Sequence, residues 1–162
     1  MKIGIDVSQL AYTNTGVSNY LGNLVSELIK NDNNSYVLFF SSLRRSVPPI
    51  VKDFIKRPNV TVKTFKLPPI VLNVMWNNFH KVPIETFVGP VDWFITSDWT
   101  EPPTKKAKKA TILYDLIVYK FPKETDEKII KVQKKKLSWV KNESALVFCI
   151  SDSTKNDALE IL

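Results

Sequence analysis

The chain has 162 residues, of which 44% are hydrophobic, and it carries a formal net charge of +7 at pH 7. This length and composition indicate one globular domain with a sizeable core, and they exclude a disordered chain. No apolar run approaches the ~20 residues of a membrane-spanning helix, and the N-terminus lacks the pattern of a signal peptide.

Strand-like and helix-like segments alternate from the first residues onward. Strands are expected at residues 2–7, 36–41, 60–67, 92–96, 110–114 and 145–150, where β-branched and aromatic residues gather. Helices are expected at residues 17–30, 48–56, 70–81 and 124–142, where the apolar residues recur at helical spacing or a proline pair opens the segment. A last helix follows Ser151, whose hydroxyl is a suitable N-cap.

This alternation predicts an α/β fold: a Rossmann-like parallel sheet with helices on both faces, formed by residues 1–162 as a single domain. The continuously apolar strand at residues 145–150 is expected to be covered on both faces. It contains the only cysteine, Cys149, which we expect to be a buried reduced thiol, as in a cytoplasmic protein. Ligands of such folds bind at the carboxyl ends of the strands.

The loop between the first strand and the first helix contains one glycine, Gly16. The N–H groups of Gly16, Val17 and Ser18 would lie at the N-terminus of that helix, which is a suitable site for a phosphate. Gly16 has no Cβ, so an anion could approach the backbone closely. The loop matches neither G-x-G-x-x-G nor a P-loop, so the local pattern is equally consistent with a glycine that only lets the chain turn.

Four segments, in this order, resemble the N-terminal domain of family 4 glycosyltransferases of the GT-B fold. They read MKIGIDVS…TGVSNYLGNLVSEL, VDWFITSDW, ATILYDLIVYKFP and LVFCISDSTKNDAL. The resemblance implies an enzyme that transfers a sugar from a nucleotide-sugar donor to a glycan or lipid-linked acceptor. It implies that this chain is the acceptor-side lobe and is inactive without a C-terminal lobe, and that the nucleotide sugar is a co-substrate with no further cofactor and no metal.

The end of the chain agrees with that expectation. Its final helix ends on apolar residues without a glycine or asparagine cap, which we interpret as one domain of a longer protein.

The resemblance also assigns roles to individual residues. Gly16, Val17 and Ser18 would contact the donor diphosphate, although Ser18 and its neighbour Asn19 replace a glycine and an arginine of the family pattern. Asp115 and Tyr114 are the candidate catalytic residues. Tyr114 stands where the family has histidine, and because a phenol is a poor base at neutral pH, it is expected to position substrate or to alter acceptor choice.

Further residues are candidates for binding the acceptor. Asp98 and Trp99 follow a strand, and a carboxylate beside an indole suits a sugar; the alternative is a loop aspartate with a partly buried ring. Asn14 and Asn19 would contact the acceptor or only form the turn, and Ser151 would contact the acceptor or cap a helix. His80, the only histidine, lies in an apolar segment and is expected to be packed.

The positive charge is concentrated in one region, since residues 105–141 contain twelve lysines and four acidic residues. Lys128, Lys131, Lys135 and Trp139 predict a peripheral contact with an anionic membrane surface; the alternative is a solvated helix face with Trp139 packed against a neighbouring segment. No nucleic acid partner is expected, because no groove-reading motif or stacking platform accompanies the lysines.

Two other function classes stay open. A non-catalytic α/β binding module, such as a degenerate glycosyltransferase lobe, is favoured by Tyr114 and Ser18, which depart from the family pattern. A basic domain that binds anionic surfaces is favoured by the lysine excess. His, Asp and Glu residues show no spacing typical of a metal site.

Overall fold

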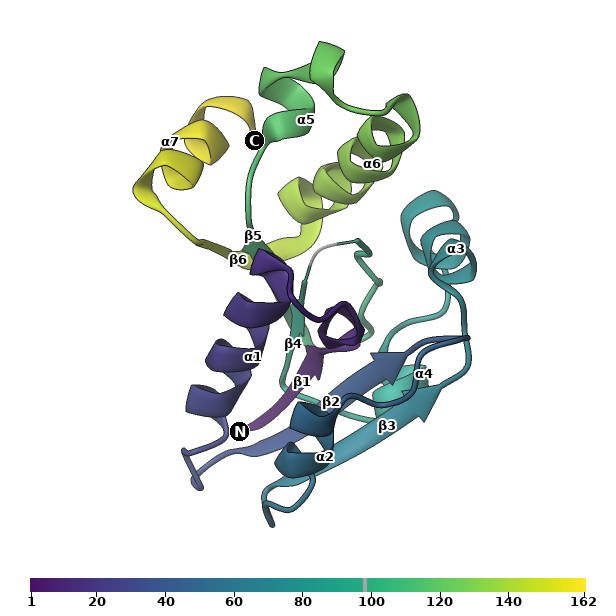
Figure 1. Cartoon of the computed structure of the whole chain (residues 1–162), viewed down its shortest axis with the longest axis vertical. Helices are drawn as coiled ribbons and strands as arrows, with labels where there is room; N and C mark the ends of the chain where they lie inside the picture. The colour runs from purple at the N-terminus through teal and green to yellow at the C-terminus, as the bar shows by residue number, and fades with distance from the viewer. Residues whose placement is uncertain (98) are drawn as a thin grey trace.

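Six strands pair side by side in one all-parallel sheet, which confirms the predicted α/β, Rossmann-like fold (Figure 1). The computed structural model describes residues 1–97 and 99–162. The strand order is β3-β2-β1-β4-β5-β6. The strands are β1 (Lys2–Asp6), β2 (Ser35–Ser41), β3 (Val60–Phe65), β4 (Trp93–Thr96), β5 (Lys108–Leu113) and β6 (Ser144–Cys149).

Helices cover both faces of the sheet, because side chains alternate between the two faces along each strand. In β2, Tyr36, Leu38 and Phe40 pack on one side with α1 (Gly16–Leu28) and α2 (Pro49–Phe54). On the other side, Val37 and Phe39 pack with the segment formed by α3 (Pro69–Leu72), the π-helical turn η2 (Asn73–Asn78) and α4 (Glu85–Val88).

The third group of helices gathers at one end of the sheet, around β5 and β6 (Figure 1). It consists of α5 (Ile117–Lys120), α6 (Glu127–Glu143) and α7 (Asp152–Ile161). Two short 3₁₀ turns, η1 (Ser8–Ala11) and η3 (Pro122–Glu124), complete the described elements. Ser151 is the N-cap of α7, as predicted, and its side chain accepts from the Thr154 N–H at 3.1 Å. Within the described residues, no helix is long and apolar enough to cross a membrane.

The prediction that both faces of the last strand are covered is wrong. Leu146, Phe148 and Ile150 are 43%, 42% and 43% exposed. β6 is the edge strand, and α7 packs on its other face, against Val147 and Cys149. The apolar side chains on one face of β6 are therefore exposed, although the strand is apolar on both faces.

The prediction that Cys149 is a buried, reduced thiol is also only partly correct. Cys149 is free, as expected, but only half-buried. Burial raises the pKa of its thiol, so the thiolate is disfavoured.

Candidate functional site

The strand order has a topological switch point between β1 and β4, where crevices form at the carboxyl ends of the strands. Asp6 ends β1, and Ser97 directly follows β4. The buried ammonium group of Lys136, on α6, donates to the Ser97 carbonyl at 2.7 Å. A charged side chain of the long helix is thereby anchored at the switch point.

Three of the predicted site residues line one hollow of about 240 Å³ at the carboxyl ends of β4 and β5. These are Trp99, Tyr114 and Asp115, and α6 adds Gln133 and Lys136 to the same wall. Asp115 is exposed, and its Oδ1 accepts from the Ile117 N–H, the first of α5, at 3.1 Å. The hollow combines an indole, a phenol, a carboxylate and an amide, which are groups suited to a polyhydroxylated ligand.

Contacts around Tyr114 join three elements at this edge. Its hydroxyl lies 3.2 Å from Ser97 Oγ, and its ring meets Tyr20 of α1 edge-on with centroids 5.8 Å apart. Its carbonyl accepts from Thr154 Oγ1, on α7, at 3.1 Å. Tyr114 is thus held in a fixed position.

The turn at Gly16 does not need a glycine, and two of the three predicted N–H groups stay available to an anion. The left-handed φ, 68°, falls on Asn14, and a Cβ on Gly16 would meet nothing within 4 Å. Gly16 is therefore not needed to turn the chain. The Ser18 N–H is not available to a phosphate, since it donates to Thr15 Oγ1 at 3.1 Å. The N–H groups of Gly16 and Val17 lie in the first helical turn, where no intrahelical acceptor exists.

The remaining predicted acceptor contacts lie elsewhere. Asn14 and Asn19 line a separate hollow of about 300 Å³ between η1, α1 and Ile50 of α2. The Ser151 hydroxyl caps α7, which is the other role that the sequence left open. Asp98 lies outside the described residues. Of the predicted acceptor contacts, Trp99 is the one that the structure brings beside Tyr114 and Asp115.

A residue that the sequence analysis missed, Asp6, is buried at the end of β1. Asp6 lines a small hollow of its own. Trp99 lines both this hollow and the one that contains Tyr114 and Asp115. Burial raises the pKa of Asp6, although Ser8, whose N–H donates to Oδ1 at 2.9 Å, and the charge of Lys136 oppose that shift. An acidic residue that closes a buried strand at a switch point was the available sequence signal.

Asparagine in place of Asp6 is expected to stabilise the fold at neutral pH, because it imitates the neutral acid that burial favours. The pKa in the fold lies above the ordinary value of 3.8, so the ionised form destabilises the fold above that pKa. Below 3.8 the carboxyl is protonated in both folded and unfolded chains, and the advantage of Asp6→Asn should vanish. Urea unfolding across this pH range measures it; a variant that is less stable at neutral pH would contradict this account.

A buried ionic cluster near the amino ends of β5 and β6 was also missed. Lys109 donates to Glu143 Oε2 at 2.6 Å and lies 3.5 Å from Glu101 Oε1, and Glu101 is fully buried. His80 Nε2 lies 2.8 Å from Glu143 Oε1. Burial by itself would raise the pKa of Glu143, but the hydrogen bonds from Lys109 and His80 hold it below the ordinary value.

His80 is packed, as the sequence predicted, and it packs on Trp139. The two rings stack with centroids 3.7 Å apart, and the Trp139 indole N–H donates to the Asn77 carbonyl at 2.8 Å. Trp139 therefore faces a neighbouring segment, which is the alternative left open above. Lys128, Lys131 and Lys135 are exposed, and the membrane contact predicted for them stays a prediction.

No protein-family model, curated protein or solved structure gives a match to this chain. The likeness to glycosyltransferases therefore rests on the four sequence segments. Across residues 1–97 and 99–162, His, Cys, Asp and Glu side chains form no group of three that could hold a metal ion.

Proposed function

We propose that this chain is the acceptor-side domain of a glycosyltransferase that uses a nucleotide-sugar donor. The observation that carries the proposal is the hollow shared by Trp99, Tyr114 and Asp115 at the carboxyl ends of the strands. An indole face packs against the apolar side of a sugar ring, and an exposed carboxylate accepts hydrogen bonds from its hydroxyl groups.

The first turn of α1 completes the proposed arrangement. Tyr20 of α1 touches Tyr114, so the helix N-terminus lies near the hollow. In the proposed reaction, the N–H groups of Gly16 and Val17 stabilise the leaving diphosphate as negative charge develops on it. A second, donor-binding domain would hold the remainder of the nucleotide sugar, as the resemblance implies.

The acceptor role of Asp115 is tested by Asp115→Asn in this chain joined to the proposed donor-binding domain. The amide keeps an oxygen for the Ile117 N–H, so the fold should persist, while the charged hydrogen bond to the acceptor is lost. Because such bonds contribute about 1.5–3 kcal/mol, kcat/KM for sugar transfer should fall roughly tenfold to a hundredfold. The matched control is Asp32→Asn, an exposed aspartate in the loop before β2, which should leave transfer unchanged.

Equal transfer by Asp115→Asn and the wild-type protein would remove Asp115 from the site. A degenerate, non-catalytic lobe is the second candidate, favoured by the engaged hydroxyl of Tyr114. It predicts binding of a sugar acceptor, weakened by Asp115→Asn, without consumption of any nucleotide sugar.

A further inference from the structure

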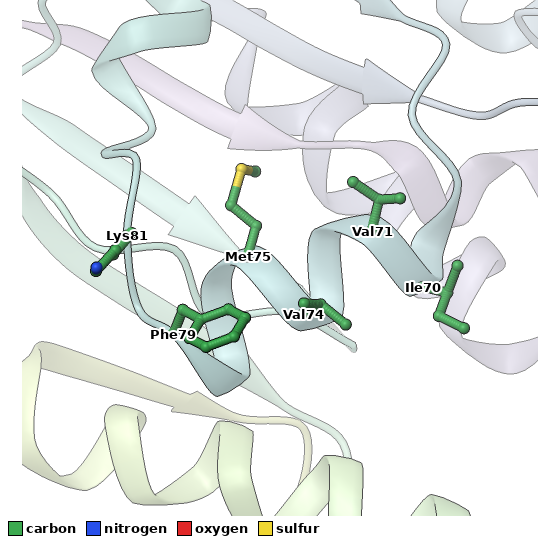
Figure 2. A pocket seen from close by; sticks show the side chains of 6 residues that line it. All are labelled: Ile70, Val71, Val74, Met75, Phe79 and Lys81. Carbon is green, nitrogen blue, oxygen red and sulfur yellow. The ribbon is translucent and has the colours of Figure 1, made fainter.

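The segment formed by α3 and η2 presents an apolar stripe to solvent, shown in Figure 2. Ile70 and Phe79 are 70% and 67% exposed, and Val71 and Val74 are exposed between them. Together with Met75 and Lys81, they line a shallow hollow of about 530 Å³. Single exposed apolar side chains are ordinary, but a contiguous group marks an interaction surface.

The buried side chains of the same segment hold its exposed apolar side chains in place. Trp76 is fully buried, and its indole N–H donates to the Val82 carbonyl at 2.9 Å. His80 and Val82 have φ values of 50° and 62°, and a β-branched residue rarely adopts such a conformation. Held, unfavourable conformations of this kind cluster at functional sites. The turn fixed by Trp76 presents Phe79 and Lys81 at the surface (Figure 2).

The part of the chain that contains the stripe carries side-chain charge of one sign. Residues 54–84 contain no acidic residue but five basic ones, namely Lys56, Arg57, Lys63, Lys66 and Lys81. Lys66 and Lys81 are exposed and flank the segment in sequence. An apolar stripe with a basic rim is complementary to a surface that combines hydrocarbon with negative charge.

The lysine row of α6 continues this surface. Trp139 stacks on His80 at the end of η2, and Lys135 Nζ lies 5.9 Å from the centre of the Trp139 ring. Lys131 follows one helical turn away on the same face of α6. Trp139, which is half-buried, thus joins the basic row to the apolar stripe.

We propose that Ile70, Val74, Phe79 and Lys81 form a docking surface for a lipid bilayer that contains anionic lipids. Apolar side chains line the hollow almost entirely, so it offers little to the directional hydrogen bonds of a protein partner, whereas acyl chains need none. The Lys81 side chain can extend its ammonium group to the headgroups while its methylenes stay beside Phe79. This proposal does not depend on the proposed sugar transfer.

Sedimentation with vesicles tests the surface directly. The wild-type protein should sediment at low salt with vesicles of phosphatidylcholine and phosphatidylglycerol in equal parts, and less with phosphatidylcholine alone. The double variant Ile70→Asn/Phe79→Asn should partition roughly a hundredfold more weakly, because two large apolar side chains no longer insert. Lys66→Glu with Lys81→Glu should weaken sedimentation and reduce its dependence on salt.

The control is Leu159→Asn, which removes a side chain that is 77% exposed on α7, away from α3 in Figure 1. It should sediment like the wild type, and circular dichroism should show that all variants are folded. Sedimentation of the Ile70→Asn/Phe79→Asn variant at the wild-type level, or none by the wild type at low salt, would overturn the proposal. So would a wild-type dimer that this variant converts to a monomer without any vesicle binding, since the stripe would then join two copies.

Discussion

Methionine in place of Lys109 is expected to lower the free energy of unfolding by about 3–5 kcal/mol. The ammonium group of Lys109 is buried between Glu143 and Glu101, and Glu101 is itself fully buried. The variant would leave the Glu101 carboxylate without a nearby cation, although Thr96 Oγ1 still donates to it at 2.7 Å. Such a loss is a large fraction of the total stability of a domain this size.

Urea unfolding followed by tryptophan fluorescence measures this change. The control is Lys108→Met, at the adjacent exposed lysine, whose Nζ lies 5.7 Å from the centre of the Trp93 ring. It should alter the free energy of unfolding by no more than about 0.5 kcal/mol. Equal effects of the two substitutions would show that the buried pair does not stabilise the fold.

Valine in place of Gly16 is expected to reduce sugar transfer by roughly two orders of magnitude, the loss typical of removing one oxyanion-stabilising donor. The isopropyl group would occupy the space through which a phosphate approaches the first N–H groups of α1. The fold should not change, because the site of the new Cβ is open and Gly16 does not have a positive φ.

Steady-state kinetics with a saturating acceptor measures the effect of Gly16→Val, and Gly16→Ala should show a smaller loss because its side chain is shorter. The unfolding midpoint of both variants should match that of the wild type. Undiminished transfer by Gly16→Val would mean that the diphosphate does not approach this turn.

The order of strands and helices could be read from the sequence because hydrophobic periodicity is a local signal. Strand ends differ from the predicted ones by one or two residues, as is usual at the ends of elements. The helical segment predicted at residues 70–81 begins close to the predicted position but widens into the π-helical turn η2, which ends at Asn78, two residues before His80, whose φ is 50°. That shape depends on Trp76, which is buried within the segment, and on Trp139, which contacts the segment from α6.

The candidate site was predictable only where it follows strand ends. Trp99, Tyr114 and Asp115 meet because parallel strands bring their carboxyl ends to one edge. The cluster of Lys109, Glu143 and His80 could not be predicted, because its members are separated by 34 and 63 residues along the chain. The exposure of Phe148 was missed for a similar reason, since it depends on which strand is at the edge of the sheet.

The proposal that this chain serves sugar transfer is tested most directly with this chain joined to the proposed donor-binding domain, by supplying a panel of nucleotide sugars and measuring released nucleoside diphosphate. The account predicts that one donor is consumed when an acceptor is present, and that Asp115→Asn and Gly16→Val both slow this release while Asp32→Asn does not. A folded protein that consumes no donor with any acceptor, or whose rate is the same in all three variants, would contradict it.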